Sequence, residues 1–325
     1  MTENRPIGDP LVSIRCLVYN HEPYLRQCLD GFLMQQTSFP FEAIVHDDAS
    51  TDGSAAILRE YAEKYPDIIK PIYETENQWG KGTISKTMDA AMHPASKYIA
   101  FCEGDDYWTD PHKLQLQVDF LETHPDYVIC SHNYRLYYQD NQRFDKKSFY
   151  EWRTKDKGND LQSVEYSLEN YFDGWWTQPL TCVYRRGPYR DEMEQKGYKS
   201  FRDDVFYYTV LTHGKGMLLL SEMGVYRIHG GGGWSSQGGI KKAKLARENA
   251  LQIYQIENDR RAFSIIGSCT EKILIDLYES GKKCEFLKEF ISFFRIAPLK
   301  ESYRLFCLVG RCIMGRTRRK LLKRI

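Results

Sequence analysis

The chain has 325 residues, of which 42% are hydrophobic and 27% are charged, so it can bury a large core and has an ordinary globular composition. This composition excludes a disordered or fibrous protein. Its net charge of +1 gives no overall attraction to nucleic acid, and no nucleic-acid partner is predicted.

The spacing of the cysteines and the length of the apolar runs indicate the cellular compartment of the protein. The nine cysteines include no C-x-x-C pair, which argues against a zinc site and favours free thiols in a reducing compartment. No amino-terminal apolar run has the pattern of a signal peptide, and no stretch reaches the length of a membrane-spanning helix. We therefore expect a cytoplasmic protein.

Strands and helices alternate along the first third of the chain. Apolar and β-branched runs predict strands at 11–18, 41–45, 68–73 and 97–101. Amphipathic spacing predicts helices at 24–36, 55–65 and 84–92. Because the connecting loops are short, this order predicts an α/β fold with a parallel sheet and helices on both faces.

Polar loops follow the first predicted strands. Tyr19 and Asn20 come after the first strand, Asp48 comes after the second, and Lys81 lies in a polar loop at 74–83. In an open α/β sheet, ligands bind at the carboxyl ends of the strands, so these loops predict a nucleotide crevice. No G-x-G-x-x-G or G-x-x-x-x-G-K-[ST] motif follows any strand, which argues against dinucleotide enzymes and P-loop NTPases.

An acidic cluster of Glu103, Asp105 and Asp106 follows the strand at 97–101. Crowded carboxylates repel one another unless a cation joins them, and such oxygen ligands suit Mg²⁺ or Mn²⁺. The alternative is a solvated acidic turn with Asp110 as the cap of a helix that begins at Pro111. The apolar positions of that helix would be Leu114, Leu116, Val118, Phe120 and Leu121.

The middle of the chain is rich in aromatic residues. A strand is predicted at 127–138, then a polar loop or hairpin, and a short strand at 181–184. Between them, Trp175 and Trp176 are either a platform for a sugar ring or part of the core. Both interpretations stay open from the sequence.

Two later segments carry chemistry-bearing residues. Asp203 and Asp204 begin a predicted helix, where carboxylates either favour the helix dipole or serve as a base. Arg227 and His229 alternate on a predicted strand before four consecutive glycines at 230–233. A glycine loop can approach a phosphate closely, and the arginine and imidazole can meet a diphosphate or a metal. The alternative is a flexible hairpin tip.

The remainder of the chain, 240–325, is helical by its apolar period. From Arg304 to Ile325, basic residues alternate with apolar ones. Such a tail can bind an anionic inner membrane surface peripherally, or it can be a solvated basic helix or a disordered end.

Three segments together resemble the family 2 inverting glycosyltransferases. They are 10–20, ending in Tyr19-Asn20; 45–54, with the sequence VHDDASTDGS; and 103–106, with the sequence EGDD. They occur in the family's order and spacing, and the resemblance covers roughly residues 10–235. It implies a GT-A nucleotide-sugar-binding and catalytic domain at 1–239, followed by a helical region at 240–325 with the basic amphipathic tail.

The resemblance also implies the chemistry. It implies a nucleotide-sugar donor, with a UDP-sugar as the first candidate, and Mn²⁺ or Mg²⁺ as the cofactor. It implies single displacement with inversion at the anomeric carbon, onto a hydroxyl of a bacterial cell-surface glycan or a lipid-linked saccharide.

Site roles follow from the same resemblance. The nucleotide-sugar site would be Tyr19, Asn20, Asp48, Lys81, Asp105 and Arg227. The metal ligands would be Glu103, Asp105, Asp106 and His229. The catalytic residues would be Asp204, as the base, and Asp203 beside it.

The sequence departs from the family pattern at two positions. Glu103 stands where the family usually has Asp, which puts its role as a ligand in doubt, and Ala49 replaces the Gly after the double Asp. No Q-x-x-R-W motif occurs, which points away from processive polymerases and toward transfer of a single sugar.

Two rival functions each predict a different residue pattern. A sugar nucleotidyltransferase would need a glycine-rich basic loop after the first strand, and residues 19–22 are not one. A non-catalytic glycan-binding or scaffold relative would be expected to have lost a carboxylate, and none is lost beyond the change of Asp to Glu at position 103.

Overall fold

The structure is a computed structural model that describes residues 6–151, 162–233, 237–303, 307 and 310. Most of the predicted basic tail from Arg304 onward therefore lies outside the described residues, as do residues 234–236 after the glycine run. Within the described part of the chain, every helix is too short or too polar to cross a membrane.

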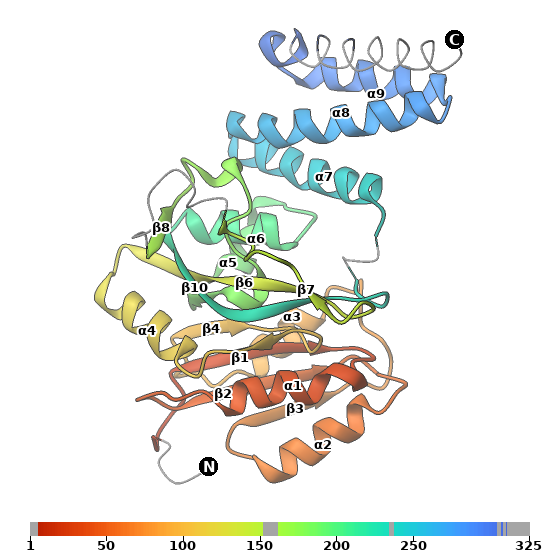
Figure 1. The fold of residues 1–325 in the computed structure, drawn as a ribbon. Coiled ribbons are helices and arrows are strands. Elements are labelled where there is room, and N and C mark those ends of the chain that lie inside the picture. Colours follow the sequence, from red (N-terminus) through yellow and green to blue (C-terminus); the bar gives the residue numbers. More distant parts are fainter. Residues whose placement is uncertain (1–5, 152–161, 234–236, 304–306, 308–309, 311–325) are drawn as a thin grey trace. The chain divides into compact units, whose positions relative to one another are not determined.

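One ten-stranded sheet forms the centre of the fold (Figure 1). Its strands are β1 (Val12–Val18), β2 (Phe41–Asp47), β3 (Ile69–Tyr73), β4 (Tyr98–Phe101), β5 (Tyr107–Trp108), β6 (Tyr127–Tyr138), β7 (Arg143–Phe144), β8 (Ser163–Tyr166), β9 (Val183–Arg185) and β10 (Lys215–Ile228). The order is β3-β2-β1-β4-β9-β6-β10-β5, with β7 beside β6 and β8 beside β10. The pairs among β3, β2, β1 and β4 are parallel, as is β6 with β10, while β5, β7, β8 and β9 pair antiparallel. The predicted α/β class with a mainly parallel sheet is confirmed.

The helices are α1 (Glu22–Leu33), α2 (Ser54–Lys64), α3 (Ile84–Ala91), α4 (Lys113–Thr123), α5 (Tyr189–Lys196), α6 (Asp203–Leu211), α7 (Gly239–Glu257), α8 (Phe263–Glu279) and α9 (Lys283–Ile296). On β1, Arg15 bonds Asp89 of α3 at 2.7 Å, whereas the Cys16 sulfur lies 3.9 Å from that of Cys28 in α1. Because neighbouring strand residues point to opposite faces, α1 and α3 cover opposite faces of the sheet.

The early strands β1 and β2 are buried along almost their whole length, including polar residues such as Arg15 and Glu42. All seven residues of β2 are buried, and so are six of the seven in β1. A parallel strand covered by helices on both faces has no solvent side, so its sequence does not alternate. The eight cysteines that the structure describes are free thiols, as predicted for those positions.

Two predicted helix starts need correction. Helix α1 begins at Glu22 rather than at residue 24 and ends at Leu33 rather than 36, because Pro23 is tolerated in a first helical turn. Helix α4 begins at Lys113 rather than Pro111, because the Asp110 side chain accepts from the His112 amide at 2.8 Å and forms a turn before the helix.

The buried face of α4 also differs from the prediction. Leu116 is 45% exposed, whereas Lys113 and Gln117 are fully buried. The ammonium of Lys113 lies 4.0 Å from the centre of the Trp108 ring, and Gln117 donates to the carbonyls of Cys130 and Thr181. Specific polar contacts therefore override the apolar pattern on this helix.

The structure decides between a sugar platform and a core position for one of the two tryptophans in the aromatic segment. Trp176 is 4% exposed, stacks on Tyr166 at 5.5 Å and donates to the Asn170 carbonyl at 2.8 Å, so it belongs to the core. Trp175 is half-buried and donates to Gln178.

The chain divides into two compact units. The first comprises Met1–Pro188 and Tyr207–Gly232 and contains the whole sheet. The second comprises Tyr189–Phe206 and Gly233–Ile325 and contains α5, α7, α8 and α9. Its core includes Ala243 of α7 with Ile273 and Leu277 of α8.

Candidate functional site

The acidic turn, residues 103–106, connects β4 to β5 in the first unit. It continues the pairing of β4 with β1, because the Gly104 amide donates to the Leu17 carbonyl at 2.8 Å. A Cβ atom at position 104 would lie 2.8 Å from Nδ1 of His21 and 3.2 Å from that carbonyl. Only glycine fits there, so the turn lies directly against the carboxyl end of β1.

The turn brings three carboxylates together. One oxygen from each of Glu103, Asp105 and Asp106 lies within 4.8 Å of the others. Among the residues that the structure describes, these are the three acidic or metal-binding side chains with that spacing. The predicted cluster is therefore present in space as well as in sequence.

Asp105 faces two imidazoles. Its Oδ2 lies 3.0 Å from Nε2 of His229, the residue after β10, and 3.9 Å from Nε2 of His21. Burial acts to raise the pKa of Asp105, but the hydrogen bond with His229 and the charge of His21 outweigh it and lower that pKa. The Oδ1 atom is buried without a hydrogen-bond partner. Asp105 thus presents an ionised carboxylate with one unused oxygen.

Asp106 has different surroundings. It is 3% exposed, and its Oδ1 accepts from the Arg227 amide at 2.8 Å. Burial, followed by the negative charge of Asp105, raises the pKa of Asp106 well above its usual value. This side chain joins the acidic turn to the end of β10.

Arg227 is enclosed by protein groups. Its three nitrogens donate to the Asp105 carbonyl at 2.8 Å, Gln139 at 2.6 Å and Gln27 at 2.7 Å. Three tyrosine rings lie 4.9 to 5.6 Å from its central carbon, those of Tyr24, Tyr107 and Tyr137. With 6% of its surface exposed, Arg227 holds the backbone of the acidic turn in place.

The loops after β1 and β2 are tied together. Asn20, at φ 55°, accepts from the Thr51 amide at 2.8 Å, and its own amide donates to Ser50 at 2.9 Å. Tyr19 is 46% exposed next to it. Asn20 therefore joins the loops after β1 and β2, and the exposed ring of Tyr19 lies next to it in the chain.

Asp48 lies in the loop after β2, and Lys81 lies in the loop at 74–83. Asp48 is 5% exposed and accepts from the Gln78 amide at 2.6 Å, which fastens the loop at 74–83. Lys81 pairs with Glu76 of the same loop at 3.0 Å. Among the contacts described, none joins Lys81 to the acidic turn, so its place in the site stays a prediction.

Asp203 and Asp204 begin α6 and belong to the second unit. Both oxygens of Asp204 accept from the side-chain amide of Asn249, at 2.8 and 2.9 Å. Burial raises the pKa of Asp204 despite this bond. Desolvation and the charge of Asp204 raise the pKa of Asp203 to about 6. The pair therefore has the raised proton affinity that a general base needs.

Sequence reasoning missed three residues that the structure singles out. His21 approaches Asp105, and Asp47, which is 2% exposed at the end of β2, has a buried Oδ1 without a partner. Both lie within three residues of the end of a predicted strand, at 18 and at 45, which was a usable signal. Asn249 carried no signal, because nothing in the sequence of α7 marks it as a partner of Asp204.

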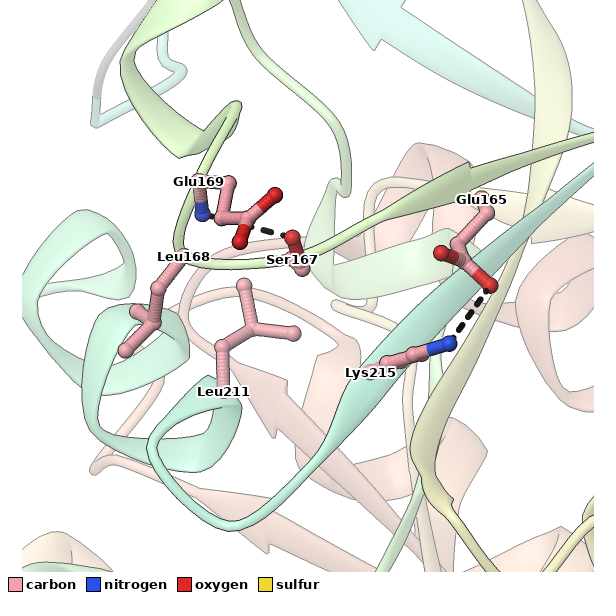
Figure 2. Close-up of a pocket in the computed structure, with 6 residues that line it drawn as sticks. All are labelled: Glu165, Ser167, Leu168, Glu169, Leu211 and Lys215. Atoms are coloured by element: carbon pink, nitrogen blue, oxygen red, sulfur yellow. Dashed lines mark hydrogen bonds and ion pairs between the residues drawn. The ribbon is translucent and has the colours of Figure 1, made fainter.

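A shallow hollow lies elsewhere in the first unit (Figure 2). It has a volume of about 410 Å³, and Glu165, Leu168, Leu211 and Lys215 are among its lining residues. Lys215 begins β10, whereas His229 follows its last residue, so the hollow lies at the opposite end of that strand. None of the predicted site residues lines it.

The chain matches known proteins most clearly through its sheet-forming region. The sequence profile described as Glycosyl transferase family 2 matches residues 13–185. An uncharacterised protein of Mycobacterium tuberculosis is 37% identical over 228 residues, which are 69% of this chain and 61% of the relative. The chain therefore spans less than two thirds of that relative's length.

Two solved structures share the fold. TarS residues 1–349 from S. aureus, in complex with UDP-GlcNAc, has a TM-score of 0.56 at 19% identity, covering 92% of this chain and 79% of that one. The mannosyltransferase PcManGT from Pyrobaculum calidifontis, in complex with GDP-Man and Mn²⁺, has a TM-score of 0.52 at 15% identity, covering 94% and 81%.

Proposed function

We propose, from the premise that the chain belongs to glycosyl transferase family 2, that it moves one sugar from a nucleotide-sugar donor to a hydroxyl of a glycan or lipid-linked acceptor. The observation that carries this proposal is Asp105. Its ionised carboxylate lies at the carboxyl edge of the sheet, contacts His229 and keeps one buried oxygen unused.

The acidic turn fits a divalent cation. The unused Asp105 oxygen and the neighbouring carboxylate of Glu103 are hard ligands, and His229 adds a nitrogen. When bound, Mn²⁺ or Mg²⁺ would neutralise the charge that grows on the departing diphosphate. Asp106 completes the cluster, although its contact with the Arg227 amide gives it a positioning role first. The Mn²⁺ reported with PcManGT supports the choice of metal.

The loops after β1 and β2 would bind the nucleotide. Asp48 would read the base, the exposed ring of Tyr19 would contact it, and Asn20 would keep the two loops joined. Lys81 would reach the donor from the loop that Asp48 fastens. UDP-GlcNAc in the TarS complex supports a UDP-sugar as the first candidate donor.

Asp204 would be the general base. It accepts the proton of the acceptor hydroxyl, the hydroxyl oxygen attacks the anomeric carbon, and the bond from that carbon to the diphosphate breaks on the opposite side. This single displacement inverts the anomeric configuration. Asn249 would orient the Asp204 carboxylate, in the way that a third group orients the base in other active sites.

The proposal extends to organisation and location. Residues 1–239 would carry donor binding and catalysis, and 240–325 would follow as a helical region. Free thiols in the described residues suit the reducing cytoplasm. The basic sequence at 304–325 would contact the inner membrane face peripherally.

The test is a panel of UDP-, GDP- and dTDP-sugars measured with Mn²⁺ by thermal stabilisation of the full chain. A donor that binds only the folded state raises the melting temperature, and we expect one nucleotide class to do so. Transfer to a saccharide acceptor is then followed by NMR, where inversion of the anomeric signal is expected. Stabilisation by no nucleotide sugar, or retention of configuration, would contradict the proposal.

A further inference from the structure

We infer that helix α9 and the segment directly after it bind an anionic lipid surface, through a row of exposed apolar side chains with cations beside it. The inference goes beyond the proposed function, because it concerns a surface of the second unit that takes no part in donor binding or transfer. It also differs from the contact proposed for 304–325, because every residue that carries it lies before that segment.

One side of α9 is used for packing inside the second unit. The helix packs against α8 (Figure 1), and Phe286 contacts the core cluster of α7 and α8. Phe293 is 3% exposed, and Glu289 pairs with Arg247 of α7 at 2.7 Å. These contacts account for the inward side of the helix.

Another side of α9 presents apolar residues to solvent. Leu287, Ile291 and Phe294 are 57%, 44% and 38% exposed, and their spacing of four and three residues places them in one row along the helix. In the helical segment after α9, Leu299 is 91% exposed and Tyr303, four residues later, is 71% exposed. Exposed apolar side chains that gather in this way mark an interaction surface, whereas single ones do not.

The exposed charges on the same helix are mostly positive. Lys288 and Arg295 each follow a residue of the row directly, so both lie along one edge of it. Lys283 is exposed as well. The one exposed acid of α9, a helix that is described along its whole length, is Glu285, and its carboxylate lies 4.0 Å from the Lys282 ammonium. The surface therefore combines apolar contact area with positive charge.

The charges favour a lipid surface over a second copy of the chain. The residues that flank the row on its two sides are Lys283, Lys288, Phe290 and Arg295, and none of them is acidic. In a pair of α9 helices joined along the row, these cations would meet one another, which is unfavourable. Anionic headgroups instead attract them, and the sequence from 304 to 325 continues the same positive charge.

The apolar row suits the boundary between headgroups and acyl chains. A helix with one apolar side and cations next to it lies in the plane of that boundary, with its apolar side towards the acyl chains. Phe294 and Tyr303 add aromatic rings, which are enriched at this depth. Both the apolar row and the cations are therefore expected to contribute to binding.

The first test is pelleting of the full chain with vesicles of phosphatidylglycerol and phosphatidylcholine in equal parts, and with vesicles of phosphatidylcholine alone. We compare wild type with Leu287→Ser/Ile291→Ser, and with Leu116→Ser at a position on α4 that is 45% exposed. The double variant should bind the anionic vesicles about tenfold more weakly, because two apolar side chains no longer leave water. Leu116→Ser should bind as wild type does.

A second pair of variants tests the charges. Lys288→Gln/Arg295→Gln should bind the anionic vesicles about 10- to 30-fold more weakly, because each cation near such a surface contributes about fivefold. The control is Arg59→Gln/Lys64→Gln, which removes two exposed cations of α2 and should bind as wild type does. Binding of the wild-type chain should weaken as salt is added.

A third measurement needs no variant. Hydrogen exchange of the wild-type chain should show that amides between 284 and 303 gain protection when anionic vesicles are added. Protection confined to 304–325, or unchanged vesicle binding in both double variants, would overturn the inference and leave the basic sequence as the membrane contact.

Failure of the wild-type chain to bind anionic vesicles would overturn the inference as well. Self-association in sedimentation that Leu287→Ser/Ile291→Ser abolishes would then assign the row to a second copy. Stabilisation of the wild-type chain by a nucleotide sugar is measured separately, so either failure would leave the proposed function intact.

Discussion

Two of the three pairs of adjacent aspartates in the sequence are proposed to carry the chemistry, Asp105-Asp106 in the acidic turn and Asp203-Asp204 at the start of α6. Their partners separate them. Asp105 contacts an imidazole and has a lowered pKa, whereas Asp106 accepts from a backbone amide and has a raised one. Asp203 and Asp204 both have raised pKa values, and Asp204 contacts an amide side chain.

The difference shows that the neighbouring donor decides what a carboxylate can do. An imidazole stabilises the ionised form, which suits a metal ligand. At Asp204 desolvation outweighs the hydrogen bond from Asn249 and the charge of Arg202, and the raised pKa makes its carboxylate a stronger proton acceptor. Residue type and position along the chain do not carry this distinction.

The largest effect on the transfer rate is expected from substitution of Asp105, and a smaller one from the same substitution at Asp106. Asp105→Asn removes the charge that the metal site is built around, so transfer should fall by roughly 10³- to 10⁴-fold, equivalent to several kcal/mol. Asp106→Asn should cost less than Asp105→Asn, because an amide oxygen still accepts from the Arg227 amide and keeps the acidic turn joined to β10. Initial rates and Mn²⁺ binding measured on both variants check this order. Equal losses would show that the two aspartates share one role.

Single substitutions also distinguish the roles of Asp203 and Asp204. Asp204→Asn should lower turnover by about 10²- to 10⁴-fold, the usual contribution of a positioned base, with donor affinity retained. Asp203→Asn is the matched control and should keep most of the rate. The measurement is donor affinity together with the initial rate at saturating acceptor. If Asp203→Asn is the slower variant, the base is Asp203, and loss of donor affinity in Asp204→Asn would instead make that residue part of the donor site.

A smaller effect is expected from the residue that supports the first pair. Arg227→Lys loses the planar group that donates to Asp105, Gln139 and Gln27 at once. Mn²⁺ affinity should fall by about 10- to 100-fold, as it does when an outer contact of a metal site is removed. Arg143→Lys is the control, because that guanidinium also lies over a tyrosine ring, at 5.1 Å, but is exposed. Equal affinity in Arg227→Lys and wild type would make Arg227 a contact of the donor rather than of the turn.

The sequence predicted the long buried elements well. Strand β6 spans the predicted residues 127–138, and β1, β2, β3 and β4 differ by one or two residues at an end. The largely apolar sequences of β1 and β2 mark them because both of their faces are covered, whereas β3 has one buried residue of five. The short strands β5, β7 and β8 were not predicted, nor was the first part of β10. They depend on pairing with β6 or β10 rather than on a pattern of their own.

The sequence indicated the residue types of the candidate site but not the contacts that these residues make. Polar residues after buried strands indicated Asp48, Asp105 and Asp106, because the carboxyl ends of parallel strands meet at one edge. Contacts such as Arg227 with Gln27, 200 residues away, or Asn249 with Asp204, join elements whose approach is set by the tertiary fold. No local spacing encodes them, so the division of roles within each pair required the structure.

The smallest effect is expected at Ala49, which lies outside both aspartate pairs and stands where the family usually has glycine. Ala49 has φ 58°, in the left-handed region, which costs an alanine about 1–2 kcal/mol. Glycine removes that strain but gives the unfolded chain more freedom, worth about 0.4–1 kcal/mol. Ala49→Gly should therefore raise the free energy of unfolding by about 0.5 kcal/mol and leave Mn²⁺ affinity unchanged.

The control for that prediction is Ala56→Gly, an exposed position within α2, where glycine should instead lower the free energy of unfolding by about 1 kcal/mol. Chemical denaturation of both variants measures the two opposite signs. Destabilisation of both would show that the loop after β2 does not need a left-handed residue at position 49. A change in Mn²⁺ affinity in Ala49→Gly would show that the nucleotide loop and the acidic turn are coupled, so that the environment of Asp105 would extend beyond its two imidazoles.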